Sequence, residues 1–266
     1  MRKELDMVPI LSMVFMLVSL IIAVGLPVIL CIWLRIVKKA DLLPFFVGCG
    51  VMLLFAFVLE QIAHTLILSS PAGTAIRGNT WLYALYGGAM AALFEETGRN
   101  LAFRTVLKKY LGRDVNALMY GAGHGGFEAI AILGIASLNN LITSVMINSG
   151  GIQALMDTLP ADAAAQVEAA VETLKTTPSG LFLMGGAERV FAVILQISLS
   201  VLVWNAVKYR EKRMLFPAAM LIHFAVDALT VILSQTGVSV YLLEAVVGIM
   251  ALLSAAAAWK VWGDRA

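Results

Sequence analysis

The chain has 266 residues, of which 61% are hydrophobic and only 14% are charged, and its mean hydropathy is +0.90. Soluble domains carry about 25% charged residues, so this composition excludes an ordinary soluble protein. The net charge of +2 comes from short basic clusters with no extended basic face, which argues against nucleic-acid binding. We therefore expect an all-α polytopic helical bundle, a single integral membrane domain over residues 1–266 in contact with the lipid bilayer.

Seven apolar segments are long enough to be membrane helices, since about 20 residues cross the hydrocarbon core. In chain order they are residues 7–37, 42–68, 81–103, 115–138, 181–207, 215–233 and 238–261. The first continues to Ile36 without a small-residue cleavage site. We therefore expect a membrane helix there, not a signal peptide.

Basic residues alternate between the loops, and loops rich in lysine and arginine stay cytoplasmic. The second and fourth loops hold Arg77 and Lys175, and the sixth holds none. The first, third and fifth loops and the tail hold Arg35, Lys38, Lys39, Arg104, Lys108, Lys109, Arg113, Lys208, Arg210, Lys212, Arg213, Lys260 and Arg265. This pattern predicts a multi-pass membrane protein with its N-terminus outside and its C-terminus inside.

The fourth loop, residues 139–180, is predicted to be extracytoplasmic and to contain a short amphipathic helix. Pro160 marks the start of that helix, Lys175 lies near its end and Pro178 follows it. Residues 139–151 are either a re-entrant piece or the end of the fourth span. A solvated connector is the more common role for such a loop, and a substrate-gating lid is the alternative.

Ionisable side chains within the spans are costly unless they are paired or face water, so each suggests a functional site. Four pairs have i,i+4 spacing and could neutralise each other locally on one helix face. They are Glu60–His64, Glu95–Arg99, His124–Glu128 and His223–Asp227, and Glu96, Glu188, Arg189 and Glu244 complete the set.

Depth distinguishes a shared site from local pairing. Glu95 lies nine residues before Arg104, His124 lies eleven after Arg113, and His223 lies ten after Arg213. At 1.5 Å per residue, each lies about 14–16 Å inside the cytoplasmic boundary. Three separate helices therefore bring a glutamate and two histidines to one level, as a common site requires.

The chemistry of these groups is hydrolytic on either of two interpretations. Carboxylates and neutral imidazoles are zinc ligands, and a second carboxylate can act as general base. Without metal, a glutamate and a histidine could activate water while another histidine stabilises the oxyanion. No HExxH motif is present.

Three motifs in order resemble those of a large intramembrane protease superfamily: EETGR at 95–99, YGAGH at 120–124 and HFAVD at 223–227. The superfamily includes the type II CAAX prenyl endopeptidases, the bacteriocin-processing (CPBP) proteins and the PrsW proteases. The segments HGGFE and AERVFAVILQISLSV are most similar to its YhfC branch of intramembrane metalloproteases. The resemblance covers residue 81 to the C-terminus.

The resemblance implies an intramembrane endopeptidase, of metallo- or glutamate type, that cleaves a membrane-embedded or membrane-proximal peptide. Glu95 would activate water with His124, and Glu96 would be a second acid. His223 and Asp227 would bind metal or stabilise the oxyanion, and Arg99 and Glu128 would orient these groups. A zinc ion, if used, would be held by His124, His223 and Glu95.

Two other functions are compatible with the same residues: a catalytically silent membrane scaffold, and a proton- or ion-coupled transporter. Glu60 and His64 could add to a metal site if the second helix leans inward. Counted along the spans, five residues lie nearer the outer side: Glu60, His64, Glu188, Arg189 and Glu244. We expect Arg189 to form a structural ion pair there with Glu188 or Glu244.

Overall fold

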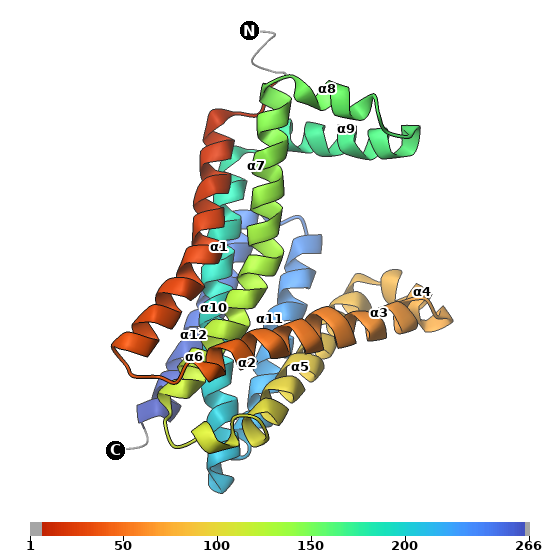
Figure 1. Ribbon diagram of the computed structural model, residues 1–266. Coiled ribbons are helices and arrows are strands. Elements are labelled where there is room, and N and C mark those ends of the chain that lie inside the picture. Colours follow the sequence, from red (N-terminus) through yellow and green to blue (C-terminus); the bar gives the residue numbers. More distant parts are fainter. Residues whose placement is uncertain (1–6, 264–266) are drawn as a thin grey trace.

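The computed structural model describes residues 7–263, and over these residues the chain forms a bundle of helices (Figure 1). No β-strand occurs among the residues described. Arg265, counted above in the basic tail, lies outside them. The predicted all-α fold class is confirmed.

Six helices within residues 7–263 are long and apolar enough to cross a bilayer. Four of them are α1 (Ile10–Ile36), α10 (Ser179–Lys208), α11 (Leu215–Gln235, with the preceding turn Arg210–Lys212) and α12 (Val240–Gly263). The other two are composite: α2 (Leu43–Val51) continues through Met52–Glu60 into α3 (Gln61–Leu68), and α6 (Val115–Ala129) continues through Ile130–Gly134 into α7 (Ile135–Asn148). Both joining segments are π-helical, a form often found beside functional sites.

The helix α5 (Thr80–Arg104) is the seventh long helix, but it is not among the six. Its C-terminal half carries four charged residues: Glu95, Glu96, Arg99 and Arg104. These charges lower its hydropathy, so the polytopic membrane bundle is confirmed while a seventh crossing stays a prediction.

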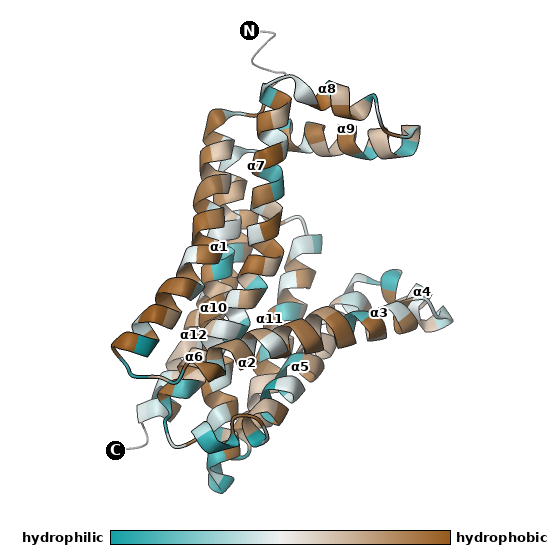
Figure 2. Cartoon of the chain, in the orientation of Figure 1, coloured by the Kyte–Doolittle hydropathy of each residue, from teal (hydrophilic) through white to brown (hydrophobic). Residues whose placement is uncertain are grey.

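The basic loops share one end of the bundle. Figure 1 places the connections before α2, α6 and α11 at the same end as the C-terminal end of α12. Hydrophilic residues gather at that end in Figure 2. This is the arrangement that the charge alternation requires, although which end is cytoplasmic stays a prediction.

At the opposite end, α8 (Gly151–Met156) and α9 (Ala161–Thr176) extend sideways from the end of α7 (Figure 1). The predicted loop helix is present as α9, and its Val171 and Leu174 are buried against Val8, Met16 and Ile147. Residues 139–148 continue α7 and are not re-entrant, because this apolar stretch extends the helix to Asn148. The loop therefore begins later than predicted, at Ser149.

The central helix is α10. Its apolar window is 67% buried, against 33% or less for the other five candidate spans. It packs against α1, α6, α11 and α12. Side chains in the middle of α10 are therefore surrounded by protein on most sides, and polar groups there must find protein partners.

Glycines allow α6 to approach its neighbours closely. A Cβ atom on Gly123 would overlap the backbone carbonyl of Phe45 in α2, and one on Gly126 would overlap Pro27 in α1. A Cβ on Gly48 would overlap the carbonyl oxygen of Tyr120 and lie 2.8 Å from the backbone nitrogen of His124. These glycines thus lie at close contacts between helices, and they place His124 in the interior.

Candidate functional site

The acidic pair and the arginine of α5 are buried. The relative exposure is 6% for Glu95 and 0% for Glu96 and Arg99. Arg99 forms an ion pair with Glu96 and donates a hydrogen bond to the Oε1 atom of Gln196 in α10. The expected local pair of Glu95 with Arg99 is not formed, because Glu96 and Gln196 occupy the guanidinium.

His124 of α6 is fully buried and faces Glu95. Its Nε2 atom lies 3.0 Å from Glu95 Oε2, and its Nδ1 atom lies 3.5 Å from the hydroxyl of Tyr120. The expected pair of His124 with Glu128 is not formed. Glu128 instead accepts a hydrogen bond from Arg189 at 2.8 Å, an ion pair between helices that replaces the local one.

His223 of α11 connects the two glutamates. Its Nδ1 atom lies 2.8 Å from Glu96 Oε1. Its Nε2 atom lies 3.9 Å from Glu95 Oε2 and 3.4 Å from Asp227 Oδ2. In the neutral imidazole the Nδ1 proton is donated to Glu96, so Nε2 is the basic atom and faces Glu95 and Asp227.

Gln196 is a member of the site that the sequence patterns did not indicate. Its Nε2 atom donates to Glu95 Oε2 at 2.9 Å and to Glu128 Oε2 at 3.1 Å, while its Oε1 atom accepts from Arg99. The residue is 3% exposed. Patterns of ionisable groups do not include a neutral amide, but an amide inside the apolar run VILQISL is itself a signal.

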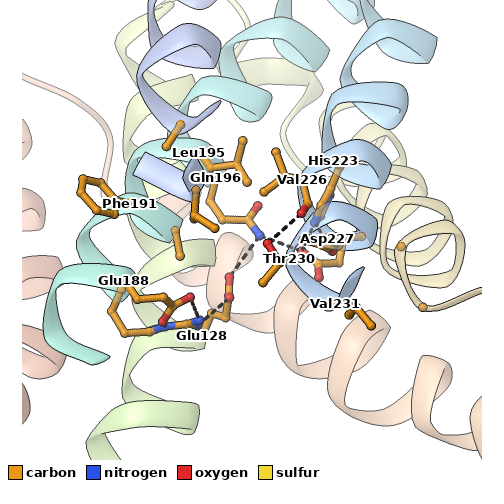
Figure 3. A pocket seen from close by; sticks show the side chains of 17 residues that line it. Glu128, Glu188, Phe191, Leu195, Gln196, His223, Val226, Asp227, Thr230 and Val231 are labelled. Carbon is orange, nitrogen blue, oxygen red and sulfur yellow. Dashed lines mark hydrogen bonds and ion pairs between the residues drawn. The ribbon is translucent and has the colours of Figure 1, made fainter. Parts of the chain in front are cut away.

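A cavity of about 330 Å³ opens beside these side chains, and Figure 3 shows Glu128, Gln196, His223 and Asp227 around it. Glu95 also lines the cavity. Glu96 and His124 do not line it and are fully buried. Glu95, Gln196, His223 and Asp227 are therefore among the polar residues of the cavity wall, whereas Glu96 and His124 are not part of it.

The cavity extends to Glu188 and Arg189, which were expected to lie apart from the site, nearer the outer side. The expected ion pair of Arg189 with Glu188 is present, and Arg189 also binds Glu128. Gln196 links Glu128 to Glu95, so one continuous hydrogen-bonded network joins Arg189 to the acids of α5. Glu244 is buried apart from this network, and its Oε2 atom has no hydrogen-bond partner among the described residues.

Glu60 and His64 pair with each other. His64 Nε2 lies 3.2 Å from Glu60 Oε1, and His64 Nδ1 lies 2.8 Å from the hydroxyl of Tyr86. Both imidazole nitrogens are therefore engaged away from Glu95 and His223. The structure does not bring this third histidine into the site.

Glu95, His124 and His223 are residue types that bind zinc, but the distances between their ligand atoms differ from those in a zinc site. No group of three or more His, Cys, Asp or Glu residues within 7–263 has the arrangement of a metal site. Glu95 Oε2 lies 3.0 Å from His124 Nε2 and 3.9 Å from His223 Nε2. Two ligands of a tetrahedral zinc with bonds near 2.0–2.1 Å would lie about 3.3 Å apart. Small shifts of these side chains would therefore bring them to ligand spacing.

The environment of His223 also fits a metal ligand. Histidine ligands usually donate their other ring N–H to a carboxylate, which orients the ring. Glu96 has this position at Nδ1, and Arg99 holds Glu96. The residues present are thus chemically suited to a zinc ion. In this arrangement the candidate ligand atoms of His124 and His223 lie next to Glu95 Oε2.

Comparison with known proteins shows the family of the chain. The model of the YhfC intramembrane metalloprotease family matches residues 21–250. A curated relative from Bacillus subtilis (strain 168), described as "uncharacterized membrane protein YhfC", is 35% identical over 247 residues, which cover 91% of this chain and 93% of the relative. No solved structure matches the chain. The family match and the full-length relative together show that the chain belongs to the YhfC intramembrane metalloprotease family.

Proposed function

We propose that the protein is an endopeptidase that hydrolyses a peptide bond in or near the bilayer, with Glu95 as the general base. The observation that carries the proposal is the placement of one oxygen atom. Glu95 Oε2 lies 3.0 Å from His124 Nε2 and 2.9 Å from Gln196 Nε2, and Glu95 lines the cavity of about 330 Å³. The description of the family supports proteolysis as the reaction class.

The reaction assigned to these residues is the addition of water to a peptide carbonyl. A water molecule in the cavity gives a proton to Glu95 as its oxygen attacks the carbonyl carbon. Glu95 then passes that proton to the leaving nitrogen, the C–N bond breaks, and a carboxylic acid and an amine are released. His124 and Gln196 hold the carboxylate in place throughout.

Glu96 and Arg99 act on this chemistry through His223. Arg99 neutralises Glu96, and Glu96 accepts the Nδ1 proton of His223. Nε2 of His223 therefore faces the cavity beside Asp227 with its lone pair available to a ligand; if the ring is doubly protonated, the Nε2–H can instead stabilise a developing oxyanion. Fixing one tautomer of a buried histidine is a frequent use of a second carboxylate.

We further propose zinc as the metal that the family description implies, with His124, His223 and Glu95 as the residues that would hold it. Zinc at His124 Nε2 would take the place of the hydrogen bond between His124 and Glu95. When bound, a zinc ion would supply Lewis acidity toward the carbonyl oxygen and lower the pKa of water. The open side of the site is the cavity itself. Its wall holds Asp227 and Gln196, which can orient a peptide or a water molecule.

The substrate is a membrane-embedded or membrane-proximal peptide segment. The cavity lies between α5, α6, α10, α11 and α12, all but α5 candidate membrane spans. A segment that reaches it must approach between these helices or from their ends. A soluble globular substrate has no such access while it remains folded.

Glu95→Gln tests the general base. The substitution keeps the size of the side chain and can still hydrogen-bond to His124 and Gln196, so the protein should fold while cleavage of a model transmembrane peptide is lost. Glu244→Gln is the matched control, because Glu244 is also buried but belongs to no part of the proposed site. Full cleavage by a well-folded Glu95→Gln protein would refute the assignment.

Metal content tests the zinc proposal independently of activity. Purified protein should contain about one zinc per chain, and His223→Ala should lower that content together with cleavage. His64→Ala removes a histidine outside the site and should change neither. Cleavage by protein that is free of metal would overturn the zinc proposal while leaving the role of Glu95 intact.

A further inference from the structure

A second cavity lies on a different face of α10 and shares no lining residue with the first. Its volume is about 490 Å³. Aliphatic residues of α6 and α10, among them Leu118, Ile197 and Val201, form its floor. Its rim is formed by Trp33 near the C-terminal end of α1, by Lys38 just after that helix, and by Trp259 and Trp262 near the C-terminal end of α12.

The course of α1 explains why this space stays open. Pro27 lies inside α1, where a proline removes a backbone hydrogen bond and bends the helix, and Figure 1 shows the lower part of α1 turning away from the bundle. The end of α1 then packs through Leu34 against Met119 and Ala122 of α6. It does not close against the end of α12, so a groove remains between the two ends.

The rim has the composition of a membrane interface. Indole side chains and basic residues are enriched at the level of the lipid headgroups. Trp33 is 44% exposed and Trp259 is 77% exposed. The ammonium of Lys38 lies 5.2 Å from the centroid of the Trp33 ring. These residues therefore place aromatic rings and one cation at the edge of an apolar floor.

The charge of the groove is positive. Lys38 is the only charged residue among the described residues that line it, and none of those described residues is an Asp or Glu. The groove opens at the end of the bundle that carries the basic loops. Basic pockets between membrane helices at this level recognise anionic headgroups.

We propose that this groove binds one anionic phospholipid. An acyl chain lies on the floor of Leu118, Ile197 and Val201, and the phosphate meets the ammonium of Lys38 and the exposed indoles. This site is separate from the proposed peptidase site and does not depend on it. It assigns a stabilising lipid to the junction of α1, α6, α10 and α12.

The test is native mass spectrometry of the detergent-purified full chain with dioleoyl phosphatidylglycerol or dioleoyl phosphatidylcholine as the probe. One phosphatidylglycerol should be retained per chain in clear preference to phosphatidylcholine. Lys38→Ala should weaken phosphatidylglycerol binding about fivefold and leave phosphatidylcholine unchanged. Lys39→Ala, one residue further on and outside the groove, is the matched control and should have no such effect.

A second variant tests the floor. Ala255→Phe fills the groove and should remove the retained lipid, and glycerol phosphate, which is the headgroup without acyl chains, should not bind. Equal retention of the two lipids would overturn the proposal. Equal weakening of binding by Lys38→Ala and Lys39→Ala would overturn it as well, because the attraction would then be that of a diffuse basic surface.

Discussion

Arg99→Met is expected to destabilise the protein strongly. Arg99 is fully buried, forms an ion pair with Glu96 and donates to Gln196. Without it, the charge of Glu96 remains in an interior where the residue is 0% exposed, and its Oε2 atom already lacks a hydrogen-bond partner among the described residues. Breaking a buried ion pair from one side costs about 3–5 kcal/mol.

The double variant Glu96→Gln/Arg99→Met separates charge from packing. It removes both charges, so no uncompensated ion remains, and replacing both members of a buried pair is often close to neutral. Arg99 Nε also lacks a partner within residues 7–263, so the native pair is incompletely satisfied. We therefore expect the double variant to recover most of the stability lost by Arg99→Met, apart from about 1 kcal/mol for the hydrogen bond to Gln196.

Equilibrium unfolding of the detergent-solubilised protein in denaturant, followed by tryptophan fluorescence, measures these differences. Trp204 is fully buried and packs against Phe103 of α5 at a ring distance of 4.9 Å, so it reports on this region. Arg104→Met, an exposed arginine on the same helix, is the control and should cost less than about 1 kcal/mol. A double variant as unstable as Arg99→Met, or an Arg99→Met protein as stable as the control, would refute the role assigned to the buried charge.

Packing, positioning and topology give three other predictions. Gly48→Ala should lower the free energy of unfolding by about 1–3 kcal/mol because its methyl group meets the backbone of α6. Gly50→Ala, where no atom lies within 4 Å, should cost nothing in the same denaturant unfolding assay. Gln196→Met should reduce cleavage of a model transmembrane peptide about 10–100-fold because Glu95 loses a donor; unchanged cleavage, as expected for exposed Gln153→Met, would contradict a positioning role. Reporter domains fused after Lys39, Lys109 or Lys212 should all report cytoplasm, and one outside location would overturn the orientation.

Much of the candidate site could be predicted because, in a helix that spans the membrane, the position of a residue in the sequence determines its depth in the bilayer. Counting from the basic loops placed Glu95, His124 and His223 at one level. The structure brings both imidazoles within 3.9 Å of Glu95 Oε2. The lengths of the apolar segments likewise predicted the long helices. The exception is α5, which is a long helix but is too charged to count among the six candidate spans.

The partners within the site could not be predicted in the same way. Spacing shows which residues share a helix face, but a neighbouring helix can offer a closer partner. Two of the four local pairs are present, Glu60–His64 and His223–Asp227. The other two are replaced: Arg99 instead interacts with Glu96 and Gln196, and Glu128 forms an ion pair with Arg189. The cavity itself arises from the packing of five helices, which no single segment encodes.

The partners of Glu96 in α5 become available at different times during protein synthesis. Glu96 binds His223, which is 127 residues further along the chain, whereas it binds Arg99 within its own helix. At about 5–20 residues per second, His223 leaves the ribosome about 6–25 s after Glu96. The pair of Glu96 with Arg99 can form throughout that interval, when the histidine does not yet exist. Arg99 is thus expected to neutralise the Glu96 carboxylate until α10 and α11 have been synthesised. A ribosome stalled before residue 196 should leave α5 loosely inserted in the membrane.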